Sequence, residues 1–293
     1  MDKVRKKIGC DGFIAERYRG RGVGVAVLDT GISPHADLKN RVISFVDFIN
    51  GSHEMYDDNG HGTHISGIIC GNGFASYGTY RGIAPSANLI ALKVLDRRGD
   101  GNTTDVLKGL EYVIRNKERL GIKIVNISIG SIPKSNSREK TRLIKGVEEA
   151  WDAGLCVVVA AGNNGPMPMS VTTPGISRKV ITVGSSDVDS YNNENTIKNF
   201  SGRGPTPYCI VKPEVVAPGV SVKSCAVHDG TYTVKSGSSM STAVVSGCIT
   251  LLTEKYPYMN NVDIKLRLYE RCIKTDMPKN QQGWGMIHLH SLL

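Results

Sequence analysis

The sequence predicts an α/β fold with a mostly parallel central sheet and helices on both of its faces. Short apolar segments, several of them bounded by glycine, alternate along the chain with longer segments of helical periodicity. No linker-like segment and no internal repeat interrupts this alternation. We therefore expect one domain over residues 22–293, preceded by a basic extension over residues 1–21.

The expected strands are short, continuous apolar runs, as is typical of strands that are buried on both faces. They lie, in chain order, at residues 22–31, 87–95, 122–130, 155–162 and 179–185. A region rich in Gly, Pro, Asn and Ser follows, through about residue 220. We expect this region to consist of turns.

The expected helices lie between and after these strands. They cover residues 103–121, 137–154, 241–256 and 260–272. The first opens with threonines that can cap it, places Val106, Leu110 and Val113 at helical spacing, and closes on Gly121. These segments supply the helices that cover the sheet.

The composition excludes several classes of protein. Lysine and arginine outnumber aspartate and glutamate by 36 to 27, which gives a net charge of +9. Such an excess suits nucleic acid or an acidic membrane surface. The basic residues, however, form no aromatic-studded RNA-binding pattern and no basic helix with heptads. We expect neither nucleic acid nor a membrane as a partner.

The apolar segments and the cysteines indicate where the protein resides. No run of about 18 or more apolar residues occurs, and no apolar stretch follows the basic start as in a secretory signal. The seven cysteines include no C-x-x-C pair, so we expect reduced, mostly buried thiols rather than disulfides or a zinc site. These features predict a cytoplasmic protein.

Two candidate catalytic residues lie where strands end and helices begin, the edge at which open parallel sheets bind ligands. Asp29 directly follows an apolar strand, and a buried carboxylate there needs a partner, although it could simply cap a turn. His61 precedes an apolar run from Ile65, and a helix start keeps a histidine neutral, as a general base must be. The H-x-x-H spacing of His61 and His64 lacks the features of zinc helices, so we predict no metal.

Two more candidates follow later in the chain. Ser239 lies just before the expected helix 241–256. A serine there is either a plain cap or a nucleophile, in which case the helix start can stabilise the oxyanion that its attack forms. Asn163 follows the strand 155–162, and its amide is either a turn former or a hydrogen-bond donor to the same site. Each residue is ambiguous by itself.

Together the candidates form a recognisable constellation. Asp, His and Ser in this chain order, with the Asn turn between His and Ser, match one of the known orders of the catalytic triad. The segments "VAVLDTGI", "DDNGHGTHISG", "VVVAAGNNGP" and "SGSSMSTAVVSG" resemble the four signature segments of subtilisin-like serine proteases. The resemblance extends from about residue 22 to residue 292 and implies a subtilisin-like three-layer fold.

The resemblance also implies a role for each residue. Ser239 would be the nucleophile, His61 the general base and Asp29 the group that orients His61. Asn163 and the backbone N–H of Ser239 would form the oxyanion hole. The implied activity is that of a serine endopeptidase acting on peptides or proteins, and the implied partners include an inhibitory propeptide or N-terminal segment.

Family members bind the substrate as an added strand between two backbone segments, which here would be residues 127–130 and 97–102. The resemblance gives these substrate-binding residues: Ser128, Ile129 and Gly130 in the first pocket, Thr172 at its far wall, and Gly99, Asp100 and Gly101 on the opposite rim. Ordinary turn formation is the alternative for the glycines. Three aspartates near that rim predict a preference for basic residues before the cleaved bond: Asp96, Asp100 and Asp105.

Some segments depart from the family pattern. Ser238 and Ala243 replace the usual Thr and Pro of the nucleophile segment. The segment 70–85 takes the place of a calcium-binding loop but carries no carboxylate. We therefore expect no required cofactor, and calcium binding stays open without support from this loop.

Two alternative functions stay open beside the leading one. The first is a dedicated protease that processes one precursor, such as a leader peptide. The second is a pseudoprotease that binds peptides without cutting them. Such proteins usually lose a triad residue, and this sequence keeps Asp29, His61 and Ser239.

Overall fold

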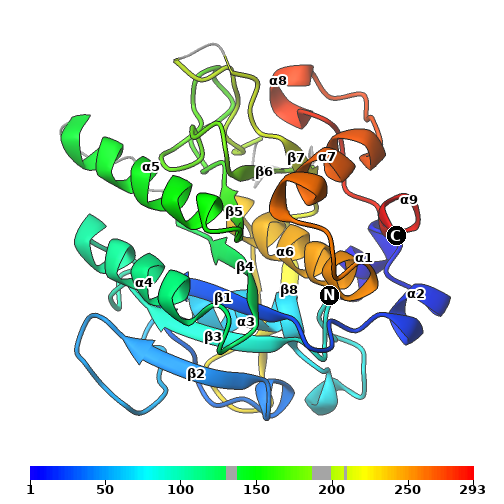
Figure 1. The fold of residues 1–293 in the computed structure, drawn as a ribbon. Coiled ribbons are helices and arrows are strands. Elements are labelled where there is room, and N and C mark those ends of the chain that lie inside the picture. The colour runs from blue at the N-terminus through cyan, green and yellow to red at the C-terminus, as the bar shows by residue number, and fades with distance from the viewer. Residues whose placement is uncertain (130–136, 187–198, 208–209) are drawn as a thin grey trace, which may run out of the picture.

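The computed structural model describes residues 1–129, 137–186, 199–207 and 210–293 (Figure 1). A seven-stranded sheet runs through the molecule in the order β2-β3-β1-β4-β5-β6-β7, and every neighbouring pair is parallel. Its strands are β1 Gly24–Asp29, β2 Val42–Asp47, β3 Asn88–Lys93, β4 Ile122–Ile127, β5 Cys156–Ala160, β6 Ile181–Ser185 and β7 Val215–Ala217. A separate antiparallel hairpin joins β8 Val222–Cys225 to β9 Tyr232–Lys235.

The five expected strands are present, and the two edge strands of the sheet are additions. β2 was not predicted, because polar residues interrupt its apolar run. Such a sequence suits this strand, since most of its residues are only half-buried. β7 has only three residues and lies inside the region expected to consist of turns. Edge strands are partnered on one side only, so their sequences are less constrained.

The sheet is the middle of three layers, as expected for an α/β fold (Figure 1). On one face α3 (His61–Cys70) packs on β1 and β3, and α6 (Ser238–Lys255) packs on β4 to β7. On the other face α4 (Thr103–Asn116) packs on β1 and α5 (Ser137–Asp152) on β5. The remaining helices are α1 Asp2–Lys7, α2 Gly12–Arg17, α7 Asn261–Arg271, α8 Lys279–Gln282 and α9 Leu289–Leu292.

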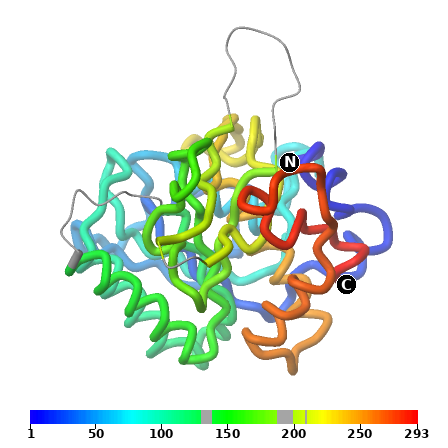
Figure 2. Tube along the Cα trace, turned by 90° about the horizontal axis from the view of Figure 1, so that it is seen from above, coloured from blue at the N-terminus to red at the C-terminus, as the bar shows by residue number. Residues whose placement is uncertain are grey.

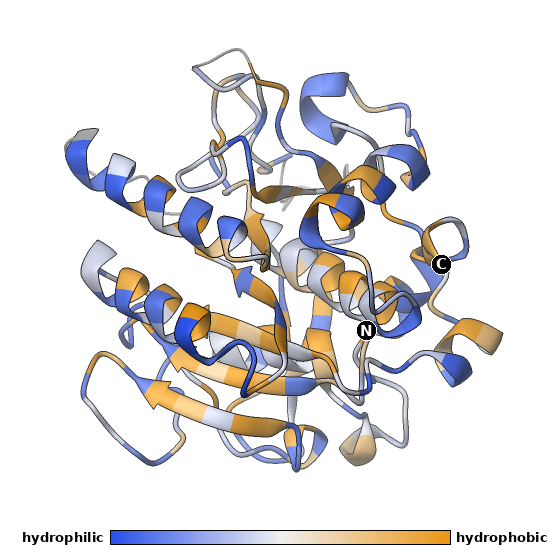
Figure 3. Cartoon of the chain, viewed as in Figure 1, coloured by the Kyte–Doolittle hydropathy of each residue, from blue (hydrophilic) through white to orange (hydrophobic). Residues whose placement is uncertain are grey.

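The helices differ in how much of their surface is buried. α4 is amphipathic, with Val106, Leu110 and Val113 turned to the core and polar residues outside (Figure 3). Residues 238–253 of α6 are all buried, which is the pattern of a helix inside a large domain. The start of α6 is therefore held in the core.

The N-terminal segment packs on the domain and shares its hydrophobic core. Val4, Ile8 and Cys10 belong to the same buried cluster as the strands of the sheet. The backbone N–H of Leu289 donates to the carbonyl oxygen of Ile8 at 2.8 Å. Both ends of the described chain consequently lie on one side of the molecule (Figures 1 and 2).

The cysteines agree with the prediction of reduced, mostly buried thiols. The six described cysteines are free, and all except Cys272 are buried, while Cys209 lies outside the described residues. No helix within the described ranges is both long and apolar enough to cross a membrane.

Candidate active site

The fold brings the four predicted catalytic positions to the carboxyl edge of the sheet. Asp29 ends β1, and Asn163 follows β5 after a short turn. His61 is the first residue of α3, and Ser239 is the second residue of α6. Since parallel strands share a carboxyl edge, residues from distant parts of the chain meet there.

Asp29 and His61 are in direct contact. The Nδ1 atom of His61 lies 2.7 Å from Oδ1 of Asp29, a carboxylate that is only 1% exposed. The backbone N–H of Thr30 donates to the same oxygen at 2.8 Å. Because a carboxylate only accepts hydrogen bonds, Nδ1 must carry the proton, and Nε2 is left to accept one.

The surroundings of His61 act on its pKa in opposite directions. Burial lowers the pKa, but the negative charge of Asp29 and the hydrogen bond to it outweigh burial and raise the pKa above its ordinary value. Asp57 also raises this pKa, whereas the cation of Lys235 lowers it. His61 therefore holds a proton more readily than a free histidine does.

Ser239 is positioned by the loop after β4. Its hydroxyl is buried and donates to the carbonyl oxygen of Ser128 at 2.9 Å. No hydrogen bond joins Ser239 to His61 in the described structure, and active sites without substrate often lack this bond. Ser239, the predicted nucleophile, is thus held at the site with its hydroxyl turned to Ser128.

Two N–H donors at the start of α6 have no acceptor among the described residues. The Oδ1 atom of Asn163 accepts from the backbone N–H and the hydroxyl of Ser238, both at 3.0 Å, which fixes the orientation of the amide. Its NH₂ group has no acceptor within the described ranges. The backbone N–H of Ser239, in the first turn of α6, likewise has none among these residues. Such a pair of donors can stabilise an oxyanion.

The bond from Asn163 to Ser238 also explains a small difference from the sequence analysis. We expected α6 to begin at residue 241, but it begins at Ser238. The side chain of Asn163, distant in the sequence, satisfies the N–H at this helix start. Ala243, which replaces the usual proline, is fully buried within the uninterrupted helix.

A buried carboxylate that the sequence analysis did not identify joins the Asp29 turn to α3. Asp57 accepts from the hydroxyls of Thr30 and Thr63, at 2.8 and 2.7 Å, and from the N–H groups of Gly60 and Thr63, both at 2.8 Å. Burial would raise its pKa, but these hydrogen bonds hold the pKa below the ordinary value. Asp57 therefore stays ionised and fixes the start of α3 relative to β1.

A buried lysine, also missed, lies behind the same turn. Lys93 ends β3, pairs with Asp29 in the register of the sheet, and is 0% exposed. Its Nζ donates to the carbonyl oxygens of Thr30 and Leu95 at 2.6 and 3.0 Å and to Oδ1 of Asp58 at 2.7 Å. The ammonium thus connects the turn after Asp29 to the segment that carries His61.

His64 differs from His61 although it is only three residues away. It is fully buried, and its Nε2 lies 3.0 Å from the carbonyl oxygen of Val222. Burial lowers its pKa to about 3, so it stays neutral. His64 is a core histidine that supports the first turn of α3.

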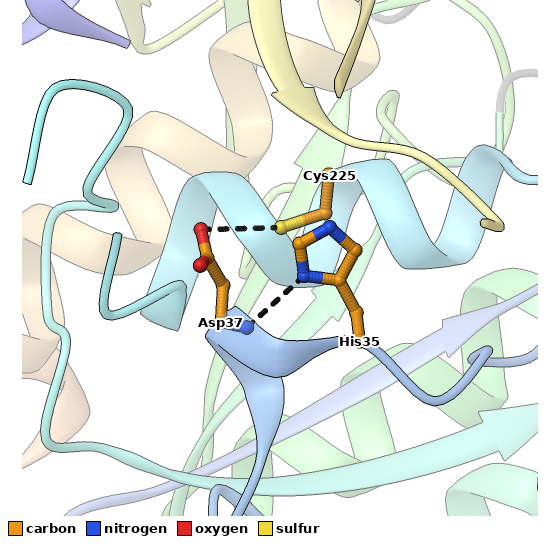
Figure 4. A group of neighbouring side chains, drawn as sticks. All are labelled: His35, Asp37 and Cys225. Carbon is orange, nitrogen blue, oxygen red and sulfur yellow. Dashed lines mark hydrogen bonds between the residues drawn. The ribbon is translucent and has the colours of Figure 1, made fainter. Parts of the chain in front are cut away.

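One group of side chains within the described ranges has metal-ligand chemistry: His35, Asp37 and Cys225 (Figure 4). Both ring nitrogens of His35 are engaged, Nδ1 by the backbone N–H of Asp37 at 3.0 Å and Nε2 by the carbonyl oxygen of Thr231 at 2.9 Å. Burial raises the pKa of Cys225 far above its ordinary value, so it is a thiol rather than a metal-binding thiolate. Hydrogen bonds within the protein account for this group.

Asp37 also holds the segment 70–85, which the sequence analysis expects in the place of a calcium-binding loop. Its carboxylate accepts from the backbone N–H of Ala75 at 2.8 Å and from the hydroxyl of Tyr232 at 2.9 Å, and its carbonyl oxygen accepts from the N–H of Asn72. Calcium needs six or more free oxygen ligands. These residues do not fit a calcium site, because N–H, O–H and S–H donors surround the one carboxylate.

The predicted substrate-binding residues occupy different environments. Ser128 and Thr172 are buried, Ile129 is half-buried, and Gly130 lies outside the described residues. Thr172 packs against Gly162, directly before Asn163. Its place beneath that turn is compatible with a pocket wall.

The opposite rim is a tight turn. Gly99 has a φ of +79°, which explains the glycine by turn geometry alone, and Asp100 and Gly101 are exposed. Asp96 accepts backbone hydrogen bonds within the turn, and Asp105 pairs with Lys108 at 2.9 Å. Of the three aspartates predicted to attract basic substrates, only Asp100 has a carboxylate without a partner among the described residues.

The chain is similar in sequence to known proteins. It matches the model of the subtilase family over residues 20–285. It is 41% identical over 290 residues to "Serine protease AprX" of Bacillus subtilis (strain 168), which covers 92% of the chain and 65% of the relative. "Subtilisin Savinase" of Lederbergia lenta is 37% identical over 92% of the chain and 90% of the relative. Relatives at this level of identity share the fold.

Solved structures agree with this assignment. Sphericase has a TM-score of 0.79 at 29% identity, and 92% of each chain is covered. A cold adapted subtilisin-like serine proteinase has a TM-score of 0.76 at 28% identity, covering 93% of this chain and 90% of the other. The chain spans 65% of the length of the AprX relative. The similarity therefore establishes the family and the fold of this chain, and not the activity of the longer protein. The chain belongs to the subtilase family, and its fold is that of a serine endopeptidase domain.

Proposed function

We propose that the protein hydrolyses peptide bonds through an acyl-enzyme formed on Ser239. The observation that carries this proposal is the 2.7 Å contact between Nδ1 of His61 and the buried carboxylate of Asp29. This contact leaves Nε2 of His61 unprotonated and ready to accept the proton of the Ser239 hydroxyl. Few structural roles require a half-exposed histidine to be oriented in this way.

The proposed reaction begins when the Ser239 hydroxyl leaves the carbonyl oxygen of Ser128 and donates to Nε2 of His61. The Ser239 oxygen then attacks the substrate carbonyl, and His61 takes the proton. The Asn163 amide and the Ser239 N–H stabilise the oxyanion. His61 gives the proton to the leaving amine, which leaves the acyl group on Ser239. His61 then takes a proton from water, the water oxygen attacks the acyl carbonyl, and the Ser239 oxygen leaves and regains its proton from His61.

We propose that substrates are extended peptides with a basic side chain before the cleaved bond. The support is the exposed carboxylate of Asp100, which has no partner among the described residues. A peptide library in which Arg or Lys at these positions brings no gain would reject this preference. An equal gain in the Asp100→Asn variant would also reject it.

A fluorophosphonate probe tests the proposed nucleophile directly. We expect the probe to label the folded protein on Ser239, as mapped by mass spectrometry, and not to label Ser239→Ala. The matched control is Ser241→Ala, because Ser241 is a buried serine of the same helix whose hydroxyl donates to the carbonyl oxygen of Ala217 at 2.8 Å. Failure to label folded protein, or labelling elsewhere, would contradict the proposal and favour a peptide-binding protein.

Other features of the whole protein are proposals as well. We propose a cytoplasmic location, supported by the six free thiols of the described chain. We also propose that calcium is not required, because hydrogen bonds already engage the carboxylate of Asp37.

Broad cleavage of casein would disfavour the alternative of a protease dedicated to one precursor. Inhibition by a peptide of residues 1–21 added in trans would support an inhibitory N-terminal segment.

A further inference from the structure

Lys235 is a cation close to the proposed nucleophile, and it has no partner in the described part of the chain. It ends β9, four residues before Ser239, and is half-buried. Among the described residues its ammonium group makes no hydrogen bond, no ion pair and no contact over an aromatic ring. Lys223, on the other strand of the same hairpin, is by contrast engaged, because its ammonium lies 4.6 Å from the ring centre of Tyr80.

The hairpin places Lys235 on the His61 side of the site. Lys235 is directly opposite Val222 in the antiparallel register, and the carbonyl oxygen of Val222 bonds His64 in the first turn of α3. The turn of the hairpin also lies against the start of α3, since Val227 packs so closely on Gly60 that a side chain there would come within 3.0 Å of it. The effect of the Lys235 charge on His61 agrees with this closeness.

The proposed reaction fixes which half of the substrate meets this cation. His61 must protonate the leaving amine, so the residues after the cleaved bond lie beside His61. The acyl half lies on the other side of Ser239, toward Ser128, as the 2.9 Å bond between these two residues indicates. A cation beside His61 therefore faces the leaving half.

We propose that Lys235 is a specificity determinant that favours substrates with Asp or Glu in the first residues after the cleaved bond. The inference rests on the proposed peptidase function and adds to it a preference on the leaving side. An acidic substrate side chain would give Lys235 the ion-pair partner that none of the described residues supplies. With Asp100 on the other side, preferred substrates would carry positive charge before the bond and negative charge after it.

Matched peptides test this inference. Three fluorogenic peptides identical except for Glu, Gln or Lys directly after the cleaved bond are compared by kcat/KM, with the cleavage position confirmed by mass spectrometry. We expect Glu to exceed Gln by about 5-fold at low salt, the upper range for a partly exposed ion pair. The preference should shrink as salt rises, because mobile ions screen it.

Variants separate the role of Lys235 from that of the overall positive charge. Lys235→Gln should abolish the preference for Glu, and Lys235→Glu should reverse it in favour of Lys. Lys223→Gln removes a charge from the same hairpin and should keep the preference. Thermal melting and fluorophosphonate labelling of each variant show that it is folded and retains its nucleophile.

Each outcome has a distinct meaning. Equal cleavage of the three peptides by the unaltered protein would overturn the inference and leave the peptidase function intact. A preference for Glu that survives in Lys235→Gln would also overturn it. If no peptide is cleaved and Ser239 is not labelled, the proposed function itself fails, and the inference fails with it.

Discussion

The two halves of the candidate site are built differently. The half that holds Asp29 and His61 is closed and densely bonded, with Asp29 only 1% exposed and Lys93 0% exposed. The half that holds Ser239 and Asn163 is more open, since Asn163 is exposed and the Ser239 hydroxyl is turned to Ser128. The ring of His61, the proposed base, is already oriented by Asp29, whereas the hydroxyl of Ser239, the proposed nucleophile, must still turn toward His61.

This difference indicates that one half of the site holds its segments in place, whereas the other half provides groups for the proposed reaction. The hydrogen bonds around Asp57 and Lys93 join segments that must keep their relative position for folding and for catalysis alike. The N–H donors of Asn163 and Ser239 have no acceptor among the described residues, and in the proposed reaction they bind the oxyanion when it forms. Changes in the first half should therefore affect both stability and rate, and changes in the second half mainly rate.

The largest effect is expected at Asp29. The Asp29→Asn change offers His61 an amide in place of a carboxylate, which removes the charge that favours the imidazolium and allows the wrong tautomer. We expect kcat to fall about 10⁴-fold, the size of loss that triad serine proteases show for this change. Single-turnover cleavage of a peptide measures it. A loss below 10-fold would mean that the 2.7 Å contact serves the fold only.

Removing the oxyanion donor should have the next largest effect. We expect Asn163→Ala to lower kcat by about 10² to 10³-fold with KM nearly unchanged, the loss known for subtilisin itself when one such donor is removed. Stability should fall by about 1 kcal/mol, because Asn163 also accepts from the first N–H of α6.

The neighbouring Asn164 provides the matched control for this prediction. It is exposed, and its side chain makes no hydrogen bond with any described residue. Asn164→Ala should leave kcat and melting temperature unchanged. Equal losses in the two variants would mean that the turn after β5, and not the Asn163 amide, affects the rate.

The sequence predicted the parts of the molecule that depend on local pattern. The five central strands, the helices α4 to α7 and the four catalytic candidates follow from apolar runs, turn residues and ordered motifs, whereas α1, α2, α8 and α9 were not predicted. The supporting residues did not follow, because their partners are distant in the sequence. Lys93 binds Thr30 across 63 residues, and Cys225 contacts Asp37 across 188 residues. A buried lysine and an exposed one look alike until the sheet places the lysine next to a carbonyl oxygen.

Removing the support of the Asp29 turn should have a smaller effect, which we expect both in stability and in kcat. Lys93→Met removes the ammonium and leaves the carbonyl oxygens of Thr30 and Leu95 without their donor. We expect a stability loss of about 2 to 3 kcal/mol, because buried carbonyl oxygens without a donor are costly. Asp58 adds little to this loss, because its side chain is 38% exposed and water can solvate it. We expect kcat to fall about 10-fold, because a small shift of Asp29 degrades the geometry of His61.

Denaturant unfolding and peptide kinetics measure both effects of Lys93→Met. Lys108→Met is the matched control, since it removes a lysine whose side chain is 54% exposed and whose ion pair with Asp105 should contribute at most about 1 kcal/mol. If Lys93→Met lowers stability but not kcat, Lys93 supports the fold without positioning the catalytic pair.

The smallest effect concerns pH. As pH rises, the activity should increase, whereas the contribution of His61 to stability should decrease. His61 acts as a base only when neutral, and its pKa is raised, so the acid limb of kcat/KM should lie above the ordinary histidine value of 6.5. Asp29 and Asp57 raise this pKa and Lys235 lowers it, so Lys235→Gln should move the limb to still higher pH. A limb that moves to lower pH in this variant would contradict the assignment.

Stability should change in the other direction over the same pH range. The protonated form of His61 pairs with Asp29 in the folded state, so its contribution is fully present below the ordinary pKa and is lost as pH rises through the raised one. Thermal melting of Ser239→Ala, which cannot digest itself, isolates this contribution when compared with the double variant Ser239→Ala, Asp29→Asn. The difference in melting temperature between the two should shrink as pH rises through this window, while activity of the unaltered protein grows. A constant difference would mean that His61 changes its charge without Asp29, and the two halves of the site would then be less distinct than the geometry indicates.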